Sequence, residues 1–141
     1  KNEVMEYVQS GKYTTDITIH DVINNQQKNE IASSSNVYLC TNGIDNAPVS
    51  FLEMMAMGLP IVTTNVGGIP YYVEDHETVL LSTDNSVENM AILIMQLHHD
   101  KTLQQKLITN GLSFINEFSS KAVAQQWLAL FYQLQQHNQP N

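Results

Sequence analysis

The sequence predicts an α/β fold in which a Rossmann-like parallel sheet is flanked by helices. Short apolar runs with the composition of buried strands alternate with helical patterns up to about residue 100. Such alternation implies right-handed βαβ units, whose strands are parallel. No internal repeat or low-complexity linker divides the 141 residues, a length that suits a single domain spanning residues 1–141.

The N-terminal elements follow from short patterns. Residues 2–10 have apolar positions at helical spacing, and residues 16–20 (DITIH) alternate like a short strand. Residues 26–32 predict a brief helix that a run of serines closes. Residues 37–40 form a continuous apolar run (VYLC), which predicts a strand.

The middle of the chain has the clearest element boundaries, because glycine and proline residues separate its patterns. The expected elements are a loop at 41–47, a helix at 48–57, a buried strand at 60–64, a turn at 66–70 and a single helical turn at 71–75.

The C-terminal part is predominantly helical. After a strand at residues 78–82 we expect three helices, at about 86–100, 101–118 and 120–136. The last of these has a regular apolar face, and on that face we expect Trp127 to lie in the core.

Composition excludes several classes of function. The net charge of −8 and the pI of about 4.8 oppose general electrostatic binding of nucleic acid or of an anionic membrane. A single cysteine, Cys40, excludes an intramolecular disulfide and offers no metal-binding spacing, so we expect a buried thiol and no metal. We also expect no cofactor. No apolar run approaches the roughly 18–20 residues of a membrane span, and no signal-peptide pattern opens the chain, which favours a cytoplasmic protein.

The most informative stretch is residues 45–70, DNAPVSFLEMMAMGLPIVTTNVGGIP. Two acids, Asp45 and Glu53, stand in it with seven residues between them, one in a loop and one inside a helix. Backbone N–H groups at the start of that helix attract phosphate. In open α/β sheets, ligands bind at the carboxyl ends of strands, where this loop lies. Acids on both sides of an anion site suit a nucleotide-sugar, which has hydroxyls at both ends and a diphosphate between.

The segment VSFLEMMAMGLPIVTTNVGGIP resembles the signature of the group 1 glycosyltransferases, which have the GT-B fold. The similarity extends from about Ile17 to Leu134. It implies the C-terminal, donor-binding part of a two-domain enzyme. The N-terminal acceptor domain and the first strand–helix unit, which carries the family's Arg and Lys, are then expected outside this chain. No catalytic residue is assignable within it, and we expect the chain alone to lack transferase activity.

The resemblance also implies roles for single residues. Asp45 would hold hydroxyls of the sugar, and Glu53 the hydroxyls of the ribose. The residues between them would face the diphosphate and sugar through their backbone or mark the helix start; they are Asn46, Ala47, Pro48, Val49 and Ser50. Gly67 and Gly68 are expected to serve a tight turn near the site rather than to bind ligand.

Some positions depart from the family pattern. Asp45 replaces the more usual Glu, Ala47 and Pro48 replace a glycine and an aromatic residue, and Tyr71 stands where a Glu is common. His76 and Val79 replace two glycines of a turn, so this turn must use other backbone angles or tolerate strain.

The expected function is transfer of a sugar from a nucleotide-diphosphate donor to a glycan, lipid or other acceptor, with retention of configuration, in surface polysaccharide biosynthesis. For the full-length protein, a peripheral position at the inner face of the membrane is an alternative to a free cytoplasmic one. Two alternatives remain open for the function. One is a non-catalytic relative that acts as a binding or assembly module, and the other is a nucleotide-sugar epimerase of the same fold.

Overall fold

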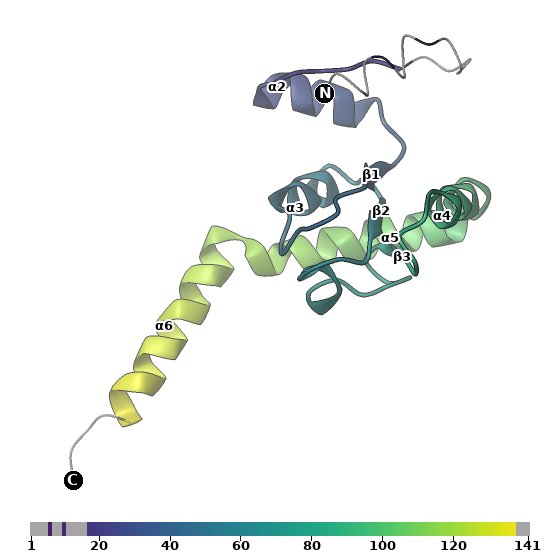
Figure 1. The fold of residues 1–141 in the computed structure, drawn as a ribbon. Coiled ribbons are helices and arrows are strands. Elements are labelled where there is room, and N and C mark those ends of the chain that lie inside the picture. Colours follow the sequence, from purple (N-terminus) through teal and green to yellow (C-terminus); the bar gives the residue numbers. More distant parts are fainter. Residues whose placement is uncertain (1–5, 7–9, 11–16, 138–141) are drawn as a thin grey trace.

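The structure is a computed structural model that describes Glu6, Ser10 and residues 17–137 (Figure 1). Within this part, β1 (Tyr38–Cys40), β2 (Ile61–Thr64) and β3 (Leu80–Ser82) form one sheet in the order β1-β2-β3. Both neighbouring pairs are parallel, with Leu39 opposite Val62 and Val62 opposite Leu80. The predicted parallel sheet is therefore confirmed.

Helices follow the strands much as the sequence patterns predict. Their bounds are α2 (Asn25–Ser33), α3 (Val49–Ala56), η1 (Ile69–Tyr71), α4 (Val87–His99), α5 (Lys101–Ile115), η2 (Asn116–Phe118) and α6 (Ser120–His137). The helical turn expected at 71–75 is wrong in position. It is the 3₁₀ turn η1, which begins earlier because Pro70 at its start has the φ that a first helical turn requires.

The core lies on both faces of the sheet. Successive side chains of a strand point to opposite faces, so Ile61 packs with Phe51 and Met55 of α3, while Val62 packs with Leu93 of α4. All four residues of β2 are buried. The central strand is therefore covered from both sides, as its β-branched composition predicts.

Two predictions for the N-terminal part have different outcomes. The helix expected at 2–10 lies almost wholly outside the described residues. The strand expected at 16–20 is wrong for residues 17–20, which have neither helical nor strand structure; Asp16 is not among the described residues. Ile17 and Ile19 are 47% and 38% exposed. Alternation alone cannot make a strand, because the backbone of a strand must find a neighbour with which to pair.

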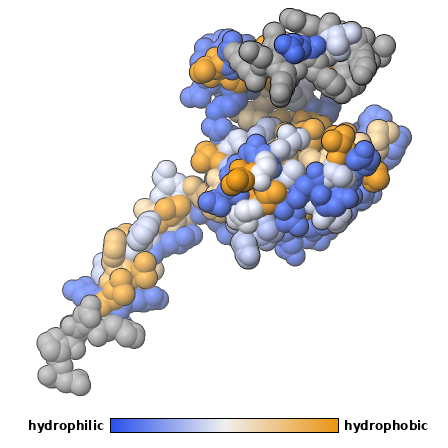
Figure 2. Space-filling model, in the orientation of Figure 1, coloured by the Kyte–Doolittle hydropathy of each residue, from blue (hydrophilic) through white to orange (hydrophobic). Residues whose placement is uncertain are grey.

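The expectation that Trp127 lies in the core is also wrong, since Trp127 is 54% exposed and stacks on Phe131 of the same helix. Helix α6 leaves the body of the fold after η2 and extends away from it (Figure 1). Apolar side chains lie along its visible length (Figure 2). The sequence pattern predicts an amphipathic helix correctly, but no other element of residues 17–119 covers its apolar face.

The turn before β3 tolerates strain, one of the two possibilities that its sequence allows. His76 has a φ of 58°, in the left-handed region, and its N–H donates to the carbonyl of Val79 at 2.8 Å. Val79 itself is fully buried and has no positive φ. The strain is therefore confined to His76, where a side chain stands in a conformation that favours glycine.

We predict that His76→Gly stabilises the protein by about 1 kcal/mol, because it relieves the left-handed strain at a small cost in unfolded-state entropy. Urea denaturation measures the change. Asn85→Gly provides the contrast, since Asn85 has a similar φ of 57° but its side chain accepts from the Asn65 N–H at 2.6 Å. Asn85→Gly should destabilise, and a loss of stability in His76→Gly would contradict the interpretation.

Candidate functional site

Two loops at the carboxyl edge of the sheet are fastened to each other. One follows β1 and leads into α3, and the other follows β2 and leads into η1. The hydroxyl of Thr64 donates to the carbonyl of Asn42 at 2.7 Å, and the N–H of Gly68 donates to the carbonyl of Asp45 at 3.0 Å. The two loops therefore form one surface at the edge where ligands of such sheets bind.

Gly67 and Gly68 allow these two loops to touch. A Cβ on Gly67 would lie 2.1 Å from the carbonyl oxygen of Asp45, and one on Gly68 would lie 2.3 Å from that of Asn46. Gly67 also has a φ of 56°. The glycines thus serve the turn and, through it, determine where the loop that carries Asp45 lies.

Asp45 lies half-buried in its loop, where the amide Nδ2 of Asn42 donates to its Oδ2 at 2.7 Å. The ring of Tyr72 packs between Phe51 and Phe114 nearby. The Tyr72 hydroxyl is buried and makes no hydrogen bond with any described residue. Burial raises the pKa of Tyr72 above its ordinary value, and the neighbouring Asp45 and Cys40 raise it further. The hydroxyl therefore stays neutral beside Asp45.

The start of α3 is left without a side-chain acceptor. Pro48, which is buried, stands at the cap position, and no side chain there accepts a capping hydrogen bond from the first N–H groups. The first N–H groups of a helix have no partner within it, so an anion at this end would be attracted both by their hydrogen bonds and by the helix dipole. Asn46, Ala47 and Val49 are exposed around this end of the helix.

Glu53 lies one turn further along α3, beside a cavity of about 240 Å³ between α2, β1 and α3. Apolar side chains line much of it, among them Ile23, Ile31, Met54 and Leu59. Its polar lining includes Glu53 and Ser50, whose Oγ accepts from the Tyr38 hydroxyl at 3.0 Å. An apolar cavity with a few polar groups is the usual form of a small-molecule site.

The pairing of Lys28 with Glu53 is what sequence reasoning missed. Nζ of Lys28 lies 2.5 Å from Oε1 of Glu53, and both side chains line the cavity. The pattern of residues 45–70 gave no sign of this, because the two residues are 25 positions apart. Only the order of the elements could have indicated it. Helix α2 precedes β1 in the chain, α3 follows β1, and both helices line the same cavity.

The structure therefore divides the predicted residues between two places. Ser50 and Glu53 line the cavity between α2 and α3, whereas Asp45 lies at the glycine turn. The start of α3 connects them. Their binding roles stay predictions.

The described residues offer neither a metal-binding cluster nor a membrane-spanning helix. No three His, Cys, Asp or Glu side chains among them gather closely enough to hold a metal ion. None of the helices in this part of the chain is sufficiently long and apolar to cross a membrane.

The sequence matches the pattern of the family described as glycosyl transferases group 1 over residues 3–114, and the chain belongs to this family. It is 26% identical over 104 residues to the N-acetyl-alpha-D-glucosaminyl L-malate synthase of Bacillus anthracis. That match covers 73% of this chain but 27% of the relative. The chain thus spans about a quarter of the length of that protein.

Two solved structures show the same fold. Sucrose-phosphate synthase from Thermosynechococcus elongatus matches with a TM-score of 0.79 and 24% identity, over 97% of this chain and 35% of that one. The C-terminal domain of a glycosyl transferase group 1 family protein from Francisella tularensis matches with a TM-score of 0.68 and 22% identity, over 82% and 60% of the two chains. The expected GT-B type of α/β fold is thereby confirmed.

We predict that Gly67→Ala destabilises the protein by about 2 kcal/mol or more, because its Cβ would meet the Asp45 carbonyl in an already strained conformation. Gly43→Ala is the matched control, since a Cβ there has nothing within 4 Å. Urea denaturation should show the control within about 0.5 kcal/mol of the wild type. Similar stabilities for the two variants would contradict the proposed contact.

We predict that Tyr72→Phe leaves stability unchanged or raises it by up to about 1 kcal/mol, because the hydroxyl that it removes is buried without a partner. Tyr38→Phe should instead cost about 1 kcal/mol, since it breaks the bond to Ser50. Thermal denaturation of both variants distinguishes the two cases. A larger loss of stability in Tyr72→Phe than in Tyr38→Phe would show that the Tyr72 hydroxyl does have a hydrogen-bond partner.

The same variant has a consequence at alkaline pH. A raised pKa means that folded Tyr72 keeps its proton when the unfolded chain, with a pKa near 10, releases it. The contribution of Tyr72 to the free energy of unfolding is thus fully present below about pH 10 and declines as the pH rises further. Above about pH 10, the stability of Tyr72→Phe should therefore fall less steeply with pH than that of the wild type.

Proposed function

We propose that this member of the group 1 glycosyltransferases binds the nucleotide-sugar donor of a glycosyl transfer reaction. The observation that carries the proposal is the position of Glu53 in the lining of the cavity between α2 and α3, one turn from the uncapped start of α3. A carboxylate beside an apolar cavity suits a nucleoside, whose base is flat and whose ribose has two adjacent hydroxyl donors.

In this proposal the donor lies along α3. Its nucleoside occupies the cavity, and the ribose hydroxyls donate to Glu53. The diphosphate lies at the backbone of residues 46–50, where the helix start offers N–H donors. The sugar reaches Asp45 beside the glycine turn. Charged acceptors make the stronger hydrogen bonds to hydroxyls, so the two acids would orient both ends of the donor.

The full reaction would move the sugar to a glycan, lipid or other acceptor with retention of configuration. We place it in surface polysaccharide biosynthesis on the cytoplasmic side of the membrane. Catalysis would rest on positioning the donor and stabilising the leaving diphosphate. Since the chain covers a fraction of its relatives, we expect residues outside it to supply the acceptor site and the cations for the diphosphate.

A binding or assembly module without catalysis is the second candidate. Tyr71 favours it, because an 89% exposed aromatic ring stands next to the glycine turn, at a position where the family pattern has an acid. Such a module would not require nucleotide binding. A titration with nucleotides therefore separates the two candidates.

We predict that the full-length protein binds at least one of UDP, GDP and ADP in isothermal titration calorimetry. Glu53→Gln should weaken this binding about 10- to 100-fold, because a hydrogen bond to a charged group contributes roughly 1.5–3 kcal/mol. Glu88→Gln on the exposed first turn of α4 is the matched control and should bind as the wild type does.

Asp45→Asn separates the two ends of the site. It should weaken binding of the nucleotide-sugar while leaving the affinity for the nucleoside diphosphate within about twofold, because Asp45 is proposed to contact the sugar alone. An absence of binding for all three nucleotides would reject the donor-site proposal and favour the assembly module.

A further inference from the structure

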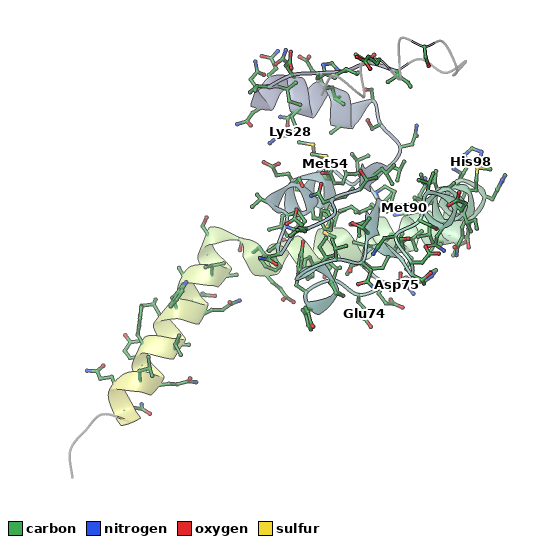
Figure 3. All side chains as sticks on the ribbon, in the orientation of Figure 1. Lys28, Met54, Glu74, Asp75, Met90 and His98 are labelled. Carbon is green, nitrogen blue, oxygen red and sulfur yellow. The ribbon has the colours of Figure 1, made fainter. Side chains whose placement is uncertain are left out.

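We propose that Lys28 is a positioning residue for the ribose-binding acid: it holds the Glu53 carboxylate through Oε1 and leaves Oε2 for the ribose hydroxyls. This inference rests on the proposed donor function. The contact comes from the geometry, in which Nζ of Lys28 and Oε1 of Glu53 are 2.5 Å apart. Figure 3 shows Lys28 on the side of α2 that faces α3, near Met54. A carboxylate has about four acceptor positions, so one ammonium group does not exhaust it.

Helix α2 is built to present this lysine to α3. Its start is closed by a capping box, in which Asn24 Oδ1 accepts from the Gln27 N–H and Gln27 Oε1 accepts from the Asn24 N–H. Ala32 packs with Met54 in a small buried cluster. Residues four positions apart lie on one face of a helix, so Lys28 faces α3 together with Ala32.

Holding Glu53 matters for affinity because a free glutamate has three rotatable bonds. Ordering such a side chain on binding costs free energy, which a side chain already held in place does not lose again. The side chains of Lys28 and Glu53 are 25% and 39% exposed. The ion pair is therefore only partly covered, and the Glu53 carboxylate stays accessible to a ligand in the cavity.

Lys28 also addresses a charge problem. The donor carries an anionic diphosphate, the chain has a net charge of −8, and Glu53 would lie one turn from the diphosphate. A carboxylate and a phosphate repel each other at such separations. The ammonium of Lys28 offsets the charge of Glu53. Solvent screens these partly exposed groups, so we expect this effect to be less than about twofold and equal for every nucleotide that carries the diphosphate.

A purely structural role makes a different prediction from a positioning role. If Lys28 served only to hold α2 against α3, its loss would weaken the binding of every ligand of the cavity to the same degree. If it positions Glu53 toward the ribose, the loss should depend on the ribose hydroxyls themselves. A 2′-deoxynucleotide removes one of these hydroxyls and so distinguishes the two roles.

The experiment compares the wild type, Lys28→Met and Lys28→Arg by calorimetry, each in the full-length protein. The probes are whichever of UDP, GDP and ADP binds the wild type most tightly, and its 2′-deoxy counterpart. We expect Lys28→Met to lower the affinity for the ribonucleotide about 3- to 10-fold and that for the deoxynucleotide less than about twofold. Lys28→Arg keeps the charge and should lose less than Lys28→Met for the ribonucleotide.

Lys106→Met is the matched control. Lys106 makes an ion pair of the same length with Glu77, 2.5 Å, on a surface away from the cavity. This variant should bind both probes as the wild type does. Circular dichroism checks that each variant is folded, and Lys28→Gln replaces Lys28→Met if the latter does not fold.

Equal weakening of the two probes by Lys28→Met would overturn the positioning role, as would unchanged binding in a protein whose Glu53→Gln variant binds less tightly. A wild type that binds none of the nucleotides would instead reject the proposed function, and this inference with it. The two failures are therefore distinguishable.

Discussion

The close contact between the glycine turn and the loop after β1 is the constraint on which the candidate site depends. Two backbones meet where no Cβ fits, and hydrogen bonds from Gly68 and Thr64 hold them together. The contact places Asp45, and with it the point at which α3 begins. Helix α3 follows this loop and packs through Phe51 and Met55 into the core, which positions Glu53. A backbone contact therefore positions Asp45, and the helix that follows it carries Glu53.

The site has to solve an electrostatic problem, because an acidic chain is proposed to bind an anionic donor. The net charge of −8 gives no long-range attraction, so binding must rely on local dipoles and single cations. The uncapped start of α3 supplies the dipole, and Lys28 supplies a cation beside Glu53. These groups act over a few ångströms, where the field of the whole domain matters less than the orientation of each donor.

Sequence reasoning succeeded where a pattern reports a local property of the chain. It failed where burial or strand pairing depended on contacts with another segment. The β-branched run at residues 61–64 and the glycine after α3 identified a buried strand and a helix end. The alternation of residues 17–20 and the apolar face around Trp127 were real patterns, yet neither segment is buried. Periodicity shows that a face is apolar, but whether anything packs on it depends on the neighbours.

The sequence by itself determined the class of fold, the family and the stretch of chain that holds the candidate site, because strand composition, turn residues and motif spacing are local. Only the tertiary structure decided that Gly67 and Gly68 serve a contact with the Asp45 loop, that His76 accepts a strained φ, and that Lys28 pairs with Glu53. The physical reason is the same in the first and last cases. Each joins residues from different elements, and their distance in space follows from how helices pack on the sheet rather than from their spacing in the chain.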